Sequence, residues 1–168
     1  MTINKTKHFV YLTILSAMAI ALNVFESIYI GSIFMNLRIG LANIIALITI
    51  YFLGPKDMII VNVMRVVIGN LLRGLIFGST FWISLGGVVL SSIVLLVLHA
   101  TKSSMMFTSI LSAIAHSLGQ VIVVALFYRQ PAIMAILPYM LLGSIPTGIF
   151  TGYLAKVLLE RIKPMKVS

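Results

Sequence analysis

Long apolar runs separated by short polar clusters dominate the pattern of the chain. The clusters are rich in Gly, Pro and Ser, the residues that most often separate helices. The runs between them approach the roughly 20 apolar residues that a helix needs to cross a bilayer. The pattern predicts six membrane-spanning helices, at residues 8–28, 40–54, 57–78, 81–99, 106–128 and 132–158. The second is short, and the segment from Ser27 to Ile39 is expected to form a loop or an interfacial segment.

Three of the predicted spans carry residues at a spacing of three or four positions that form a polar stripe on one face of the helix. The stripes are Ser16, Ala19, Asn23 and Glu26 in the first span, Asn62, Arg65, Gly69 and Arg73 in the third, and Ser109, Ser112, His116 and Gln120 in the fifth. Polar groups inside a bilayer need partners within the protein or in a wet cavity. The three polar stripes are therefore predicted to converge inside a helical bundle.

Composition supports a membrane protein. Of the 168 residues, 61% are hydrophobic and 9% are charged, whereas a soluble domain has about 25% charged residues. The expected fold is an all-α bundle in which residues 1–168 form one transmembrane domain, without a second, soluble catalytic domain. The sequence Ala17-Met18-Ala19 has the form of a signal-peptidase site, but the apolar run continues to Phe25, which favours a retained first helix.

The distribution of basic residues predicts the orientation. Net charge is +9, and cytoplasmic loops of membrane proteins carry the excess of Lys and Arg. One side would hold Lys5, Lys7, Lys56, Lys102, Lys156, Arg161, Lys163 and Lys166, and the other Arg38, Arg73 and Arg129. An even number of spans then places both termini in the cytoplasm. In a chain this apolar, the basic excess favours anionic lipid headgroups as partners over nucleic acid.

The residues that are missing limit the chemistry. The chain has no cysteine and only three acidic residues. It contains neither a P-loop nor an H-E-x-x-H motif, and no two acids are close enough in sequence to form a local magnesium site. We therefore expect no metal, no cofactor and no catalysis by this chain alone.

The polar stripes predict a binding site for an anion. Arg65 and Arg73 of the stripes, with Arg38 from the first loop, outnumber the single acid Glu26. The planar fork of arginine suits carboxylate or phosphate. The predicted ligand-binding residues are Arg38, Asn43, Arg65, Asn70, Arg73, His116 and Gln120, with Glu26 orienting an arginine. The alternative is structural: Asn and Gln side chains tie helices together, Glu26 pairs with one arginine, and Arg73 reaches the headgroups.

Four short segments carry a resemblance to a known family. They are Arg38-Ile39-Gly40-Leu41-Ala42-Asn43, Tyr51-Phe52-Leu53-Gly54-Pro55, Arg65-Val66-Val67-Ile68-Gly69-Asn70 and Ala115-His116-Ser117-Leu118-Gly119-Gln120. In this order they resemble the family of heptaprenyl diphosphate synthase component I, also called the Gx transporter family, from about residue 9 to residue 158. That family is similar to the S components of energy-coupling factor (ECF) transporters. These S components are six-helix proteins of the bacterial cytoplasmic membrane with cytoplasmic termini and an outward ligand pocket.

The resemblance implies partners and leaves two functions open. Ala17 and Ala21 match the alanine motif with which S components dock a transmembrane coupling subunit, which works with two ATPases. On this hypothesis the chain is the substrate-binding subunit for uptake of a small anionic or amphipathic metabolite. The alternative is an accessory subunit of a polyprenyl diphosphate synthase, because the single aspartate, Asp57, cannot supply the aspartate-rich motifs of the chain-elongating enzymes. A third reading is a scaffold without a ligand.

Glycines at helical spacing are expected to let helices approach closely. Gly148 and Gly152 form a GxxxG pattern in the last span. Such patterns serve packing within a bundle and docking of a partner alike, and we favour packing within the bundle.

Overall fold

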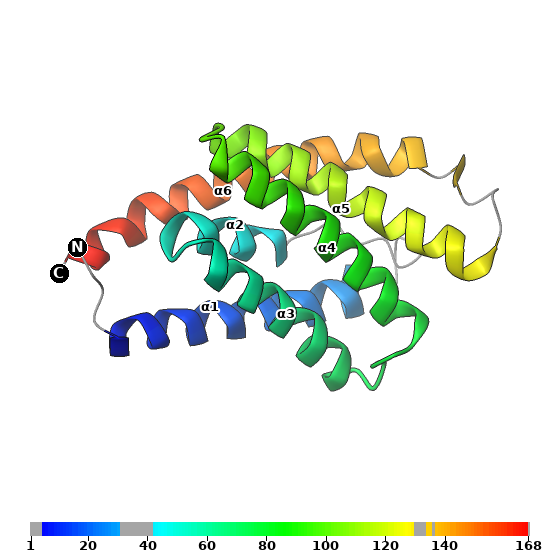
Figure 1. Cartoon of the computed structure of the whole chain (residues 1–168), viewed down its shortest axis with the longest axis horizontal. Helices are drawn as coiled ribbons and strands as arrows, with labels where there is room; N and C mark the ends of the chain where they lie inside the picture. The colour runs from blue at the N-terminus through cyan, green and yellow to red at the C-terminus, as the bar shows by residue number, and fades with distance from the viewer. Residues whose placement is uncertain (1–4, 31–41, 130–133, 136, 168) are drawn as a thin grey trace.

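The computed structural model describes residues 5–30, 42–129, 134–135 and 137–167 (Figure 1). Within these residues the chain forms six α-helices and one π-helical turn, and no strand. The elements are α1 (Lys5–Phe25), η1 (Glu26–Ile30), α2 (Ala42–Phe52), α3 (Pro55–Leu72), α4 (Ser79–Ala100), α5 (Met105–Tyr128) and α6 (Leu137–Val167). Each of the six predicted spans thus corresponds to a helix, and the all-α fold is confirmed.

The polar clusters of the sequence act as helix boundaries. Gly54 has a φ of 124°, and Pro55 follows as the first residue of α3, where a missing N–H costs nothing. Ser104 caps α5, because its Oγ accepts a hydrogen bond from the Phe107 N–H at 3.3 Å. The third helix ends at Leu72 rather than at the predicted residue 78, since the chain turns there through Gly74 with a φ of 65°.

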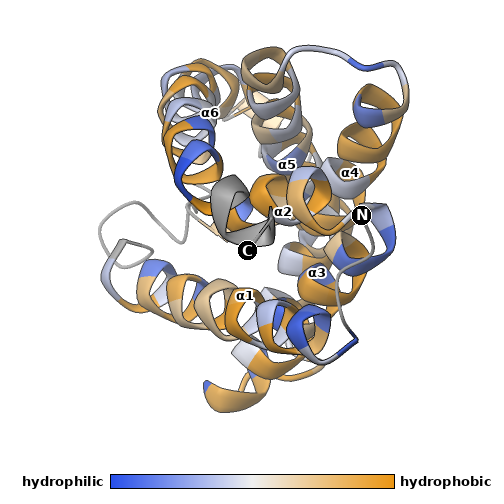
Figure 2. Ribbon diagram, turned by 90° about the vertical axis from the view of Figure 1, so that its left-hand side faces the viewer, coloured by the Kyte–Doolittle hydropathy of each residue, from blue (hydrophilic) through white to orange (hydrophobic). Residues whose placement is uncertain are grey.

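The helices form two groups with α2 between them. α1 packs on α3, and α4, α5 and α6 pack side by side (Figures 1 and 2). α2 contacts α1, α3 and α6, and ten of its 11 residues are buried. Leu47 and Ile48 of α2 form one core cluster with Val61 of α3, Leu95 of α4 and Leu159 of α6. The shortest of the six α-helices is therefore the centre of the core.

The beginning of α1 and the end of α6 lie at the same end of the bundle (Figure 1). The turn between α3 and α4 and the end of α5 lie at the opposite end (Figure 1). This arrangement agrees with the alternation of the predicted spans, while the side that faces the cytoplasm stays a prediction.

Four helical segments are long and apolar enough to cross a membrane, as in a multi-pass membrane protein: Lys5–Tyr29, Ser79–Ala100, Met105–Tyr128 and Leu137–Ile162. Large apolar side chains on their outer faces support this, among them Phe9, Leu126 and Tyr153. α2 is only about 16 Å long at 1.5 Å per residue, about half of a bilayer core. α3 has 18 residues and carries Lys56, Asp57 and Arg65. The count of six crossings therefore stays a prediction.

The first helical segment extends further than expected. The segment from Ser27 to Ile39 was expected to form a loop or an interfacial segment, but the structure continues α1 through the π-helical turn Glu26–Ile30. A π-turn shifts the phase of the helix by one residue, which a regular spacing does not anticipate. The rest of that predicted loop, residues 31–39, lies outside the described residues.

Glycines bring the helices of the second group into backbone contact. A Cβ on Gly119 of α5 would collide with the carbonyl oxygen of Gly86 on α4, and one on Gly148 of α6 would lie 2.7 Å from the Ile110 Cα of α5. Gly152 of α6 packs on a side chain of α5 instead, since a Cβ there would lie 2.9 Å from the Ser109 Cβ. The prediction that Gly148 and Gly152 serve packing within the bundle is confirmed.

Candidate functional site

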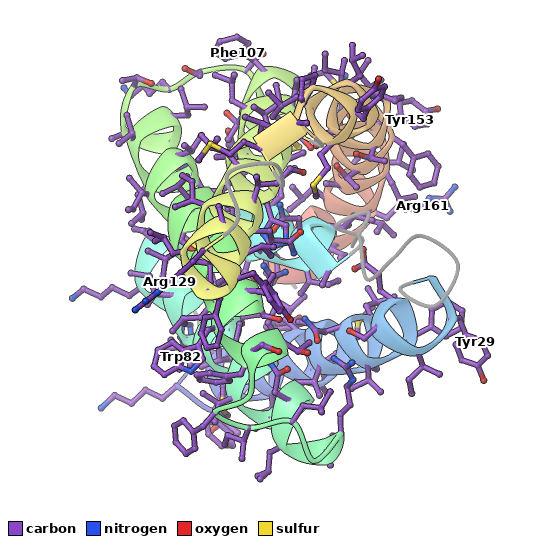
Figure 3. All side chains as sticks on the ribbon, turned by 90° about the vertical axis from the view of Figure 1, so that its right-hand side faces the viewer. Tyr29, Trp82, Phe107, Arg129, Tyr153 and Arg161 are labelled. Carbon is purple, nitrogen blue, oxygen red and sulfur yellow. The ribbon has the colours of Figure 1, made fainter. Side chains whose placement is uncertain are left out.

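The three polar stripes face the interior. In α1 and η1, all four stripe residues are buried, and so are all four in α5. In α3, Asn62, Arg65 and Gly69 are buried and Arg73 is half-buried. Figure 3 shows nitrogen and oxygen atoms between the ribbons, while the labelled Tyr29 and Tyr153 point away from the bundle. The burial that the stripes predicted is confirmed.

Arg65 is the most deeply buried charge of the described residues. It lies in the middle turns of α3 and is 1% exposed. Its Nη2 donates a hydrogen bond to the Oδ1 of Asn43 at 3.1 Å, and Asn43 lies in the first turn of α2. A guanidinium can only donate, so the amide oxygen of Asn43 must face it. The Asn43 Nδ2 is then left as a buried donor, and it has no hydrogen-bond partner.

Asn23 lies against α3 one turn beyond Arg65. A Cβ on Gly69 would lie 3.0 Å from the Asn23 Oδ1, so the glycine makes room for the amide. Asn23 is 5% exposed, and its Oδ1 has no hydrogen-bond partner. The Oγ of Ser27, one turn further along, is likewise buried without a partner. Polar side chains of α2 and α1 thus lie against successive turns of α3, with Asn43 at Arg65 and Asn23 at Gly69.

Asn70 and Arg73 continue the polar face of α3. Asn70 is fully buried, and its Nδ2 donates to the carbonyl oxygen of Val66 at 2.7 Å, while its Oδ1 has no partner. Arg73 follows the last residue of α3, and its Nη1 is buried without a hydrogen-bond partner. Arg38, the third predicted arginine, lies outside the described residues.

His116 and Gln120 lie between α4 and α5, not beside Arg65 and Asn43. Their Nε2 atoms lie 3.1 Å apart within α5. Both pack against Gly87 of α4, where a Cβ would lie 3.0 Å from the His116 Nδ1 and 2.8 Å from the Gln120 Cγ. The structure thus joins Arg65 directly to Asn43 and places His116 with Gln120 between α4 and α5.

Glu26 is 2% exposed and is the first residue of η1. Its predicted role, to orient an arginine, stays a prediction.

Ala17 and Ala21, the predicted docking residues, are exposed on α1. They line an apolar groove of about 580 Å³ between α1, η1 and α3. Ile68 and Leu72 supply the α3 wall. The two alanines are accessible to a partner helix, and docking itself stays a prediction.

Two residues of the site were missed by the sequence analysis. Asn23 was assigned to a stripe without a ligand role, and Ser27 was assigned to a loop or an interfacial segment. A signal for Ser27 exists, because it follows Asn23 by four positions and so extends the same helical face.

The groups at this site are hydrogen-bond donors and acceptors that can bind a polar ligand. Among residues 5–30, 42–129, 134–135 and 137–167, no group of His, Asp and Glu could hold a metal ion. The site offers amide groups from three helices and a buried guanidinium. Such groups can hold the polar head of a ligand in a region that excludes water.

A family model described as heptaprenyl diphosphate synthase component I matches residues 15–158, which is most of the chain. No curated protein sequence and no solved structure matches.

Proposed function

The chain belongs to the heptaprenyl diphosphate synthase component I family, and we propose that it is a non-catalytic membrane subunit that binds an anionic, amphipathic ligand between its helices. The observation that carries the proposal is the buried Arg65–Asn43 pair, with amide atoms that lack partners on Asn43 itself, on Asn23 and on Asn70. Buried ionisable groups in membrane segments usually serve function.

The family supports a soluble synthase subunit as the partner. Asp57, the one aspartate, lies 3.1 Å from the Nε2 of His8 at the start of α3. It therefore ties α1 to α3 and is no part of an aspartate-rich magnesium motif. This supports an accessory role in which the partner carries the catalysis.

We propose that the lysine-rich end of the bundle faces the cytoplasm of a bacterial cell. This end holds Lys5, Lys7 and Lys56, which are exposed, as the positive-inside rule requires. A soluble synthase subunit would meet the membrane protein there.

Co-expression tests the accessory role. Membranes that contain the chain are combined with a soluble polyprenyl diphosphate synthase from the same genome, and product chain length and rate are measured. We expect either to change when the chain is present, because an accessory subunit alters the partner that it binds. Identical products and rates with and without the chain would contradict the proposal. Membranes with the Arg65→Met variant, which keeps the volume but not the charge, separate ligand binding from partner binding.

A second candidate function is substrate capture for uptake, energised by a separate ATPase module. The exposed Ala17 and Ala21 in the apolar groove favour it, because small residues admit a partner helix. Ala17→Trp and Ala21→Trp should then abolish co-purification with a transmembrane coupling subunit. Ile14→Trp is the control, since Ile14 is exposed on α1 but does not line the groove. Retention of the complex by both alanine variants would rule out this docking surface.

A further inference from the structure

An apolar groove runs along the outer face of α4 and α5. Its volume is about 490 Å³, within the range of about 300–1,000 Å³ that is typical of small-ligand sites. Gly86 of α4 and Gly119 of α5 line it, and they have no side chains to fill the space above their backbone contact. The other walls are apolar and include Trp82, Val89 and Phe127. The groove therefore suits a narrow, apolar molecule.

The groove faces the bilayer rather than the interior of the bundle. Both helices are long and apolar enough to cross a membrane, and the side chains of Val89, Leu126 and Phe127 are exposed. The polar residues described above lie elsewhere, because Arg65 and Asn43 join α3 to α2. Lipid chains are the apolar molecules that surround an outer helix face in a membrane.

One end of the groove has the features of a headgroup region. Trp82 lies in the first turn of α4 and is 41% exposed, and tryptophan is enriched where a membrane meets water. Arg129 is exposed and follows Phe127, a residue of the groove, by two positions at the end of α5. Figure 3 shows the labelled Trp82 and Arg129 on the same side of the molecule.

The charge at this end favours an anionic head. Of the three acidic residues in the chain, Asp57 bonds His8 and Glu160 lies toward the end of α6, both at the opposite end of the bundle (Figure 1). Glu26 is buried in η1. Arg129 is therefore an exposed cation with no exposed acid at its end of the bundle. A phosphate can supply that negative charge, because a guanidinium donates charge-assisted hydrogen bonds to phosphate oxygens.

We propose that the groove between α4 and α5 binds one anionic phospholipid of the membrane, with an acyl chain along Gly86 and Gly119 and the phosphate at Arg129. The two glycines allow the chain to approach both backbones, which adds van der Waals contacts. Arg129 selects the negative head. This site goes beyond the proposed function and requires only that α4 and α5 cross the membrane.

Fluorescence quenching tests the site. Trp82 is the only tryptophan of the chain and lines the groove, so bromine atoms on a bound acyl chain quench its emission. The chain is reconstituted in phosphatidylcholine vesicles with a rising fraction of either phosphatidylglycerol or phosphatidylcholine, brominated on the acyl chains. We expect the wild type to prefer the brominated phosphatidylglycerol by about three- to fivefold, the effect of one cation near a headgroup.

Arg129→Gln should remove most of this preference. Lys102→Gln is the matched control and should keep it. Lys102 is also exposed and also has a positive φ, 55° against 50° for Arg129, but it lies at the opposite end of the α4–α5 pair.

A larger side chain in the groove tests where the acyl chain lies. Val89→Phe should weaken quenching at low fractions of brominated phosphatidylglycerol, because the ring occupies the groove. Ile93→Phe, one turn further along α4, should leave quenching unchanged, since Ile93 is exposed but does not line the groove.

Each contrary result would overturn the proposal. Equal quenching of the wild type by the two lipids would show ordinary bilayer contact without selection. A preference that persists in Arg129→Gln would place the phosphate elsewhere, and unchanged quenching in Val89→Phe would place the acyl chain elsewhere. Absence of quenching in the wild type, together with a dimer in chemical crosslinking, would show that a second copy of the chain covers the groove.

Discussion

The two groups of helices treat their buried polar residues differently. Between α5 and α6, the Ser109 Oγ lies 2.7 Å from the carbonyl oxygen of Gly148, to which it donates, and 2.9 Å from the Thr151 Oγ1. The hydroxyl groups of Ser117 and Ser144 also form a hydrogen bond between α5 and α6. Around α3, buried polar atoms without a partner are more numerous and occur on Asn23, Ser27, Asn43, Asn62, Asn70 and Arg73, while α4 has one on His99, at Nδ1.

This difference distinguishes buried polar residues that join helices from those that can bind a ligand. A polar stripe alone fits both interpretations, because each predicts burial. Partners distinguish them: the hydroxyl groups of α5 and α6 join helices, as the structural interpretation expects. The amides near α3 keep unused hydrogen-bonding capacity, which a ligand can use. The ligand hypothesis therefore applies to the α1–α3 side, and part of the α5 stripe holds the bundle together.

The largest expected effect concerns the glycine contact between α4 and α5. Gly119→Val places a side chain against the Gly86 carbonyl and should destabilise the protein by about 3 kcal/mol. Gly143→Val is the matched control, since a Cβ there meets nothing within 4 Å. Thermal unfolding in detergent measures both. Similar melting temperatures for the two variants would show that α4 and α5 do not pack at backbone distance.

Polar-to-alanine substitutions test the difference between the two groups of helices most directly. Ser109→Ala removes two interhelical bonds and should cost about 1–2 kcal/mol. Asn23→Ala removes an acceptor without a partner and should leave the ligand-free protein equally stable or more stable. Chemical unfolding of both variants provides the measurement. If Asn23→Ala costs as much as Ser109→Ala, the two sides of the bundle do not differ as described.

Arg73 sharpens the assignment of the binding side. Arg73→Gln should weaken pyrophosphate binding by about three- to tenfold, because a charge-assisted bond is lost. The stability of the Arg73→Gln variant should differ from the wild type by less than about 0.5 kcal/mol, since Arg73 is only half-buried. Equilibrium dialysis and thermal unfolding on the same sample measure the two effects. Unchanged affinity would remove Arg73 from the site.

The smallest effect concerns the His8–Asp57 pair. A double-mutant cycle with His8→Ala and Asp57→Ala should give a coupling of about 0.2–1 kcal/mol, the range of exposed ion pairs. A coupling above about 2 kcal/mol would show that this contact, rather than apolar packing, holds α1 on α3.

The sequence predicted helices better than it predicted their contacts. Apolar runs and Gly54-Pro55 located the elements, since length and turn chemistry are local properties. The sequence of α2 is apolar almost throughout and lacks a regular repeat of polar positions. It therefore did not show that this short helix is the centre of the core. The Arg65–Asn43 bond joins residues 22 positions apart on different helices. Only the packing of α2 against α3 brings them together.

Spacing also left the partners of the glycines open. Gly148 and Gly152 were correctly expected to pack within the bundle, but the sequence did not show that α5 is their partner. Ser27 was missed because the sequence does not show that the first helix continues through the π-turn Glu26–Ile30.

The backbone contact between Gly86 and Gly119 has a mechanical consequence. Side chains can change rotamer to absorb a displacement, but two backbones in contact cannot. We therefore expect α4, α5 and α6 to move as one rigid body and any opening of the bundle to displace α1 and α3 against it. Hydrogen exchange would reveal this as slow exchange along the α4–α5 seam and faster, ligand-sensitive exchange in α1.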